Sequence, residues 1–279
     1  MGNAYERKLI FEDTIGWIGK SRKLKESVRD SKASSKVYWE DEYPYFEHAL
    51  KWNTEIVVTK NRTFEAAKKL RFADPQDRIA VLNFANAFHP GGGVSQGAGA
   101  QEEWLCRCST LYPVLTDEAL VKSFYAYHKR KGSSYASDAL IYSEDITVCK
   151  SDESLPQRLP EKEWFQVDVI TMAAPDLRTK DNRYFGLMNG GASMSDVQMY
   201  AYHLKRAVHM LHVAASKKVD ILVLGAFGCG AFQNNPEIVA KAYKNALEMF
   251  PGVFKKVEFA VYCSSYDTQN YIAFKNEFE

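Results

Sequence analysis

The sequence carries almost no net charge. Its 36 Lys and Arg residues are balanced by 35 Asp and Glu, which leaves a formal charge of +1 at pH 7. A protein that binds duplex nucleic acid non-specifically needs a basic excess to meet many phosphates. The balance therefore argues against such binding and leaves room for a local site that takes a small anionic ligand.

Cysteines and long apolar runs are also scarce. Five cysteines are spread through 279 residues, and their odd number argues against a disulfide framework. No run approaches the roughly 18 apolar residues of a membrane span, and the segment Met1–Lys8 lacks the apolar core of a signal peptide. We therefore expect a cytoplasmic protein that has no membrane contact.

Hydrophobic residues make up 46% of the chain and charged residues 25%, which is typical of a globular protein with a sizeable core. From about residue 51 onwards, short apolar runs alternate with amphipathic segments, and this pattern predicts an α/β fold around a mostly parallel or mixed sheet. The predicted strands are Glu55–Thr59, Ile79–Phe84, Asp138–Ile146, Val167–Ala173, Asp220–Leu224 and Lys256–Tyr262. The predicted helices are Thr63–Leu70, one beginning near Gln101, Asp196–Lys217 and Pro236–Phe250.

Residues 1–50 differ from the rest of the chain. They are rich in charged and aromatic side chains, and helical pieces within them can place several apolar residues on one face. No glycine-rich linker separates them from the segment that begins at residue 51. We expect a helical N-terminal extension over 1–50 that packs on a domain over 51–279, with an apolar face supplied by Leu9, Ile10, Ile15, Trp17 and Ile18.

A first glycine-rich loop follows the predicted strand Ile79–Phe84. Five glycines fall within the nine residues Gly91–Gly99, directly before a predicted helix. Ligands of open α/β sheets bind outside the carboxyl ends of the strands, and glycine lets another group approach the backbone closely. The loop is therefore a candidate ligand cradle, although a surface loop without function gives the same composition.

Two adjacent carboxylates, Glu102 and Glu103, open the helix after this loop. Neighbouring side chains on a helix diverge by roughly 100°, so the two groups cannot serve one point on one face. One can hold a ligand hydroxyl while the other faces a reacting bond. Compensation of the helix dipole is the alternative explanation, because acidic residues favour the first helical turn.

A second glycine-rich loop follows the predicted strand Asp220–Leu224 and ends at the start of the helix at Pro236. Backbone N–H groups in such a turn, together with a helix N-terminus, suit a phosphate or a diphosphate. No Gly-Lys-Ser/Thr follows, and the dinucleotide fingerprint with its downstream acid is missing, so neither a Walker loop nor a Rossmann site is predicted.

These motifs resemble a known family. Gly91-Gly92-Gly93, seven intervening residues and Gln101-Glu102-Glu103 resemble the signature of poly(ADP-ribose) glycohydrolases, and Asn83-Phe84-Ala85-Asn86 resembles the NxxN strand end of macrodomains. The resemblance covers roughly residues 55–265 and is to the compact, bacterial-type branch. It implies a macrodomain-like three-layer α/β/α sandwich with a mixed sheet.

The resemblance also implies the ligand, ADP-ribose. Its diphosphate would lie in the second loop, with two phenylalanines against sugar or base, and its distal ribose would lie near the glycine triplet and Asn86. Asn83 would tie the first loop together, and the strand end Met172–Asp176 would line the adenine side. The expected substrate-binding residues are Asn86, Gly91, Gly92, Gly93, Gln101, Phe227, Gly228, Cys229, Gly230, Ala231 and Phe232.

The implied reaction is hydrolysis of the ribose–ribose O-glycosidic bond of poly(ADP-ribose). Glu103 is the expected general acid and base, and Glu102 is expected to position the leaving ribose. Acid function at neutral pH requires burial to raise the pKa of Glu103 against the opposing effect of the helix N-terminus. Two alternatives stay open: a macrodomain that binds ADP-ribose without cleaving it, and a hydrolase that removes mono-ADP-ribose from a protein or a nucleobase.

We expect no metal and no other cofactor, because no cluster of His, Cys, Asp and Glu has metal-ligand spacing and the chemistry uses carboxylate and water alone. The expected partner is ADP-ribose or poly(ADP-ribose) on a modified protein, and ADP-ribosylated nucleic acid stays open as a carrier. The expected oligomeric state is a monomer.

Overall fold

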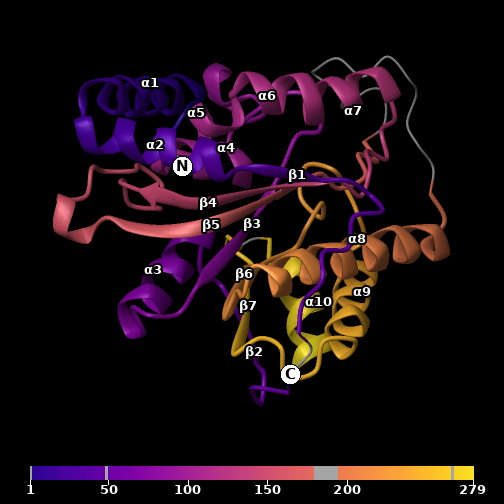
Figure 1. Ribbon diagram of the computed structural model, residues 1–279. Helices are drawn as coiled ribbons and strands as arrows, with labels where there is room; N and C mark the ends of the chain where they lie inside the picture. Colours follow the sequence, from indigo (N-terminus) through magenta and orange to yellow (C-terminus); the bar gives the residue numbers. More distant parts are fainter. Residues whose placement is uncertain (1, 48–49, 179–193, 265–266) are drawn as a thin grey trace.

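The computed structural model describes residues 2–47, 50–178, 194–264 and 267–279. Its centre is a seven-stranded mixed sheet in the order β1-β4-β5-β3-β6-β7-β2 (Figure 1). The five strands from β5 to β2 run parallel, whereas β4 is antiparallel to both of its neighbours. The strands are β1 (Lys36–Tyr38), β2 (Glu55–Thr59), β3 (Ile79–Phe84), β4 (Leu140–Val148), β5 (Phe165–Met172), β6 (Ile221–Leu224) and β7 (Lys256–Ala260).

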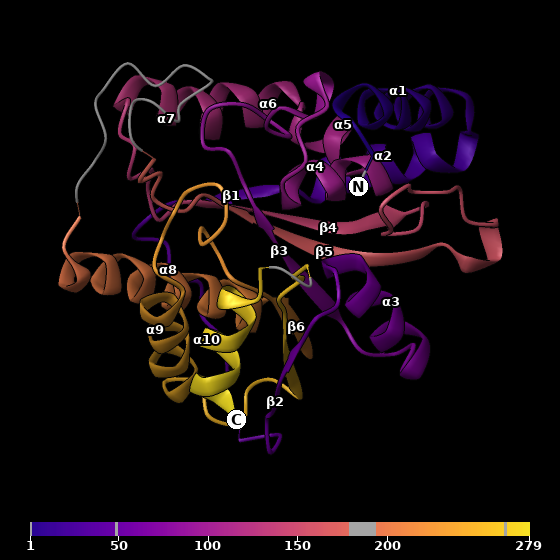
Figure 2. The same ribbon diagram turned by 180° about the vertical axis from the view of Figure 1, so that it is seen from behind.

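Helices cover both faces of the sheet, so the three predicted layers are present (Figures 1 and 2). Alternate residues of β3 serve the two layers: Ile79 and Val81 pack on one side, and Ala80 and Leu82 on the other. One layer holds α8 (Asp196–Ser216), α9 (Pro236–Glu248) and α10 (Gln269–Phe278). The helical segments on or beside the other face include α3 (Thr63–Ala73), α4 (Gln101–Cys108), α5 (Leu111–Leu115), α6 (Glu118–Leu120), the π-helical segment η2 (Val121–Tyr125) and α7 (Ala126–Lys131).

The N-terminal segment forms α1 (Ala4–Lys20), α2 (Arg22–Ser34) and β1. The Asn3 and Glu6 side chains form a capping box at the start of α1, and Thr14 in its middle donates a hydrogen bond to the Arg107 carbonyl of α4 at 2.7 Å. Strand β1 then pairs with β4 and extends the sheet. The sequence predicts helices here but not this three-residue strand. The division into an extension and a catalytic domain stays a prediction.

Most predicted elements are confirmed with small shifts in their bounds. Strand β3 and the start of α4 occur at the predicted residues, whereas β4 begins and ends two residues later than predicted. Strand β7 ends at Ala260, because Val261 and Tyr262 leave the sheet and line a cavity. Within the described residues, no helix combines the length and apolar character needed to cross a membrane.

Candidate active site

A cavity of about 1010 Å³ lies outside the carboxyl ends of the parallel strands, where the sequence predicts a ligand site. Both glycine-rich loops line it, together with the residues that follow β2 and β7 and the start of α1. All predicted site residues line the cavity except Gly91 and Cys229. Gly91, with a φ of +69°, instead packs against the ring of Tyr112, and Cys229 packs against the core beneath α8 and α9.

Glu102 lies almost completely under the surface at the end of β3. Its carboxylate accepts hydrogen bonds from the Asn86 backbone N–H at 2.7 Å and from the Asn83 side-chain amide at 3.3 Å. Burial, reinforced by the neighbouring charge of Glu103, holds the pKa of Glu102 well above its usual range. Glu102 thus fastens the loop to the strand end and tends to keep a proton.

Glu103, one residue further along α4, points toward the glycine triplet. One carboxylate oxygen accepts from the Gly93 N–H and the other from the Ala100 N–H, both at 2.9 Å. A Cβ atom at Gly92, whose φ is +57°, would clash with this carboxylate. The chain therefore needs glycine here for two reasons: the left-handed backbone and the close approach of Glu103.

Two side chains that the sequence predicts to bind the ligand, Gln101 and Asn86, form hydrogen bonds within the protein. The Gln101 amide accepts from the Phe84 N–H at 2.9 Å and donates to the Leu82 carbonyl and the Thr63 hydroxyl, which joins β3, α3 and α4. The Asn86 side chain accepts from two backbone N–H groups in its own turn, at 2.8 and 3.0 Å. Both residues still line the cavity, but these contacts shape its wall.

The second loop, between β6 and α9, is held from below by one amide. The buried Asn234 side chain donates to the carbonyls of Pro175, Gly228 and Phe232 at 2.7, 3.0 and 3.3 Å. His203 of α8 lies 2.9 Å from the Asn234 side-chain oxygen through Nε2. Because the amide nitrogen serves the carbonyls, the oxygen is the acceptor, so His203 donates.

We call the hydrogen-bonded pair Asn234 and His203 the clamp, and it determines which backbone groups of the second loop face the cavity. The three carbonyls that accept from Asn234 point away from the cavity, where they would repel a phosphate. Gly228, with a φ of +79°, packs its Cα against Ala174 and Asn234, whereas a Cβ at Gly230 would meet no atom within 4 Å. Gly230 therefore exposes its backbone to the cavity, and the end of β5 borders the loop.

The cavity also contains residues that the sequence motifs do not include. Arg62, which follows β2, is 9% exposed and stacks on the rings of Tyr262 at 3.9 Å and Trp104 at 5.2 Å. Its Nη2 atom is buried without a partner among the described residues. Arg62 comes just after the predicted strand Glu55–Thr59, and Tyr262 ends the predicted strand Lys256–Tyr262. Because ligands of open α/β sheets bind at the carboxyl ends of strands, these two positions in the sequence were a signal that could have identified both residues.

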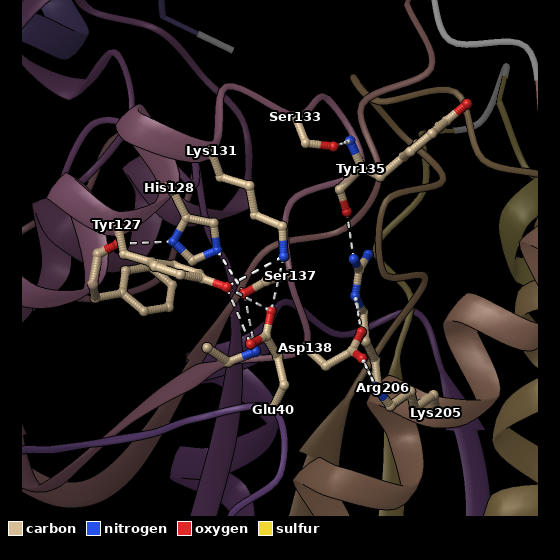
Figure 3. Close-up of polar contacts among 12 residues, drawn as sticks. Glu40, Tyr127, His128, Lys131, Ser133, Tyr135, Ser137, Asp138, Lys205 and Arg206 are labelled. Carbon is tan, nitrogen blue, oxygen red and sulfur yellow. Dashed lines mark hydrogen bonds and ion pairs between the residues drawn. The ribbon is translucent and has the colours of Figure 1, made fainter.

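A polar network joins α7, α8 and the segment 133–138 (Figure 3). The buried Arg206 of α8 donates to the Tyr135 carbonyl and forms an ion pair with Asp138 at 3.2 Å. His128 of α7 donates through Nδ1 to a backbone carbonyl, so Nε2 accepts from the Ser137 hydroxyl at 2.9 Å. These contacts fix the segment 133–138, which precedes β4.

The segment 133–138 touches each side of the site. Ala136, strained at a φ of +56°, packs with Ala87 and Phe88 of the first loop and with Ala173 at the end of β5. The Ser134 carbonyl accepts from the Asp176 N–H at 2.7 Å, just beyond the residues that border the second loop. The network in Figure 3 therefore fixes a segment that contacts the first loop and the residues that border the second.

Comparison with known proteins agrees with this geometry. Residues 14–151 match the family described as microbial-type PARG, catalytic domain, where PARG is poly(ADP-ribose) glycohydrolase. The crystal structure of PARG from Thermomonospora curvata is 31% identical, with a TM-score of 0.82 over 98% of this chain and 100% of that one. The same enzyme bound to the inhibitor ADP-HPD is 32% identical with a TM-score of 0.81 over the same shares of both chains.

A further similar structure contains ADP-ribose. PARG from Deinococcus radiodurans in complex with ADP-ribose is 31% identical, with a TM-score of 0.75 over 90% of this chain and 96% of that one. No curated protein matches the chain. The family match, the identity and the near-complete coverage together show that the chain belongs to the microbial-type poly(ADP-ribose) glycohydrolases.

Proposed function

We propose that the chain hydrolyses the ribose–ribose O-glycosidic bond of poly(ADP-ribose) and releases ADP-ribose, with Glu103 as general acid and base. The observation that carries this proposal is the convergence of two buried carboxylates at one end of a nucleotide-sized cavity whose other parts include a loop suited to a diphosphate. The similar poly(ADP-ribose) glycohydrolases include complexes with ADP-ribose and with the inhibitor ADP-HPD, and these complexes support the same substrate.

In the proposed reaction, the Glu103 carboxylic acid gives its proton to the glycosidic oxygen as the bond to C1 of the distal ribose breaks. Positive charge that develops on this ribose is stabilised by the carboxylate that remains. The carboxylate then takes a proton from a water molecule, whose oxygen attacks C1. One proton leaves Glu103 and one returns, so the group is restored after each turnover.

Glu102 has a positioning role in this scheme. Its carboxyl is fixed by Asn83 and by the Asn86 N–H, and its raised pKa favours a protonated form that can donate to a ribose hydroxyl. A neutral Glu102 also avoids two adjacent negative charges once Glu103 has given up its proton. We therefore assign orientation of the sugar to Glu102 and proton transfer to Glu103.

The positions of the other parts of ADP-ribose are inferred from the order of the strands. Glu102 and Glu103 lie at the end of β3, the second loop follows β6, and Arg62 and Tyr262 follow β2 and β7. With the distal ribose at the carboxylates and the diphosphate on the second loop, the adenosine reaches Arg62 and Tyr262. Ala174, in the segment Met172–Asp176 that the sequence assigns to the adenine side, lines the cavity next to Gly228 of the second loop, and the assignment of this segment to adenine stays a prediction.

The test compares three substrates: poly(ADP-ribose), mono-ADP-ribosylated protein and ADP-ribosylated DNA, with products separated by chromatography. Release of ADP-ribose from the polymer supports the proposal. Release from only one of the other substrates supports a mono-ADP-ribosyl hydrolase, and binding of ADP-ribose without release from any substrate supports a non-catalytic binding module.

The remaining sequence-based expectations are part of the same proposal. We propose a cytoplasmic monomer that acts on ADP-ribose polymer attached to modified protein, with ADP-ribosylated nucleic acid as a second carrier to be tested. Size-exclusion chromatography with light scattering measures the oligomeric state, and a mass of twice 31.7 kDa would contradict the monomer.

A further inference from the structure

The end of the first loop, residues 97–99, is held by the N-terminal helix α1. A Cβ atom at Gly97, whose φ is +79°, would clash with the Ala4 carbonyl, so the start of α1 touches the loop backbone directly. Arg7, one turn further along α1, donates through Nε to the Gly97 carbonyl at 2.7 Å, and its guanidinium packs against Gly99. Contacts across 90 residues of sequence therefore join α1 to the loop that leads into α4 (Figure 1).

The same part of the loop is held from the other side by Arg107 of α4. This residue is fully buried, and its guanidinium donates through Nε to the Arg7 carbonyl at 3.0 Å and through Nη2 to the Ala98 carbonyl. The Arg107 backbone carbonyl in turn accepts from the Thr14 hydroxyl at 2.7 Å. One buried residue therefore joins α1, α4 and the first loop.

Ala98, which Arg107 holds, lies between the two backbone groups that fix the Glu103 carboxylate. These groups are the N–H of Gly93 and the N–H of Ala100, and the Ala98 N–H itself donates to the Gly93 carbonyl at 3.1 Å. A shift of Ala98 would therefore move the donors and, with them, the carboxylate proposed to protonate the glycosidic oxygen. A displacement of about 1 Å at a reacting group can reduce a rate by about 100-fold.

Arg107 also places a positive charge close to Glu103. The two residues are four positions apart on α4, and side chains with this spacing lie on one face of a helix. Burial lowers the pKa of Arg107, and the charge of Glu103 is the main influence that opposes this effect. Because a guanidinium stays protonated in proteins, Arg107 supplies a fixed charge that favours the Glu103 carboxylate after its proton has gone to the leaving group.

The contacts of Arg107 are directed toward the active site. A buried cation adds little net stability, because the loss of its hydration offsets its contacts. The Nη1 atom of Arg107 is buried without a hydrogen-bond partner among the described residues, which lowers its net contribution further. Its guanidinium carbon lies 5.1 Å from the ring of Trp104, which lines the active-site cavity. The loop, the acid and a cavity-lining ring are thus the groups that Arg107 orders.

We propose that Arg107 is a positioning residue of the catalytic centre, which together with α1 holds the first loop in the shape that aims Glu103 at the glycosidic bond. The inference rests on the proposed function, which assigns proton transfer to Glu103. In the described part of the chain, Arg107 is not among the residues that line the active-site cavity, so it acts through Ala98 and Glu103. The proposal makes α1 part of the active-site scaffold.

The first test measures turnover of poly(ADP-ribose) and calorimetric affinity for ADP-ribose in Arg107→Met and Arg107→Lys. Met removes the charge and both donors, so kcat should fall by about 10- to 100-fold, while KM and the affinity for ADP-ribose stay within about threefold. Lys keeps the charge and can reach one of the two carbonyls, so its kcat should lie between those of Arg107→Met and the unmodified enzyme. An unchanged kcat in Arg107→Met would overturn the proposal, and so would equal losses of kcat and affinity.

Thr14→Val is the matched control, because it removes a buried hydrogen bond between α1 and α4 without removing a contact of the first loop. Its melting temperature should fall by a few degrees, while its kcat stays that of the unmodified enzyme. A loss of kcat in Thr14→Val as large as that in Arg107→Met would show a general effect of stability and overturn the positioning role.

The second test does not depend on activity. Amide hydrogen exchange over residues 93–100 should be faster in Arg107→Met than in the unmodified protein and in Thr14→Val, whereas exchange over the second loop should stay the same. Unchanged exchange over 93–100 in Arg107→Met would overturn the positioning role. Failure of the unmodified enzyme to release anything from polymer would instead overturn the proposed function, so the two failures can be told apart.

Discussion

The two glycine-rich loops have similar compositions but are held in different ways. The first is fastened by carboxylates, since Glu102 accepts from the Asn86 N–H and Glu103 from the Gly93 N–H. The second is fastened by an amide, Asn234, which donates to carbonyls. The first fastening draws backbone donors away from the ligand, and the second draws backbone acceptors away from it.

This difference matches the chemistry expected of each loop. In the first loop, acids that shape the backbone are also the acids proposed for the reaction, so structure and catalysis share the same atoms. In the second loop, the fastening groups Asn234 and His203 lie beneath the surface, and the backbone above them meets the ligand. Substitutions in the first loop should therefore change both the stability of the protein and its turnover. In the second loop, a substitution should be able to change one of these without the other.

The largest effect is expected from Glu103→Gln. Turnover of poly(ADP-ribose) should fall by about 10² to 10⁴, because an amide neither donates the proton nor activates water. Two backbone N–H groups donate to the Glu103 carboxylate, and in the variant one of them will face an amide nitrogen, which cannot accept a hydrogen bond. The melting temperature should therefore also fall by a few degrees. Chromatography and thermal unfolding measure the two effects, and turnover within about threefold of the original would contradict the assignment.

Glu102→Gln sharpens the division of roles within the first loop. The positioning role predicts a smaller loss of turnover than in Glu103→Gln, because the amide can still hold a ribose hydroxyl. Chromatography of the released ADP-ribose compares the two variants. If Glu102→Gln proves the more damaging change, the roles of the two acids must be exchanged.

Gly230→Val should abolish most ligand binding without unfolding the protein. A Cβ at this position meets no protein atom within 4 Å, so the new side chain occupies the space of the diphosphate instead. Loss of one or more hydrogen bonds to a charged group should weaken ADP-ribose binding by about 10- to 100-fold. Calorimetry and thermal unfolding check both statements. Gly16→Val, at an equally open position on α1, is the control, and an unchanged affinity in Gly230→Val would remove the loop from the site.

Asn234→Ala tests the fastening of the second loop. Three carbonyls lose their donor, so ADP-ribose affinity should fall by about tenfold, while adenosine, which lacks the diphosphate, should bind almost as before. Asn235→Ala is the matched control, because this side chain caps α9, and its loss costs about 1 kcal/mol of stability without removing a donor from the three carbonyls. A similar loss of affinity for both ligands in Asn234→Ala would contradict a specific role in diphosphate binding.

The smallest effect concerns pH. Burial lowers the pKa of His203 to about 4, with a further contribution from the charge of Arg206. A group whose pKa is depressed in the folded state stabilises the fold above its unfolded pKa of about 6.5, and this stabilisation is lost as pH falls toward about 4. Between about pH 7 and pH 4, the melting temperature of His203→Gln should therefore fall less than that of the unmodified protein. Parallel curves would show that His203 does not titrate in this window.

Patterns with a local cause could be predicted from the sequence. The apolar run of β3, the glycines after it and the acids that open α4 all occur where a strand-loop-helix unit requires them. The same alternation of strands and helices predicted the α/β layers. Strand β1 was missed because three residues in a charged and aromatic region carry no periodic pattern, and its pairing with β4 depends on contacts distant in sequence.

The finer division of labour within the site could not be predicted. The sequence motifs predicted that Gln101 and Asn86 line the site, but the hydrogen bonds from their side chains to the protein backbone appear only in the folded structure. The clamp made by His203 and Asn234 joins residues 31 positions apart, and neither belongs to a recognisable motif. Arg62 is the opposite case. Its position just after a correctly predicted strand could have indicated that it lines the site, although it belongs to none of the recognised motifs.

The start of α1 has a practical consequence for handling the enzyme. Ala4 and Arg7 line the active-site cavity, and Arg7 donates to the Gly97 carbonyl of the first loop at 2.7 Å. A purification tag or fluorescent fusion joined ahead of this helix would emerge at the mouth of the cavity and compete with a long polymer for entry. The end of α10 lies at the other side of the molecule (Figure 1), so fusions for assays with polymer belong there.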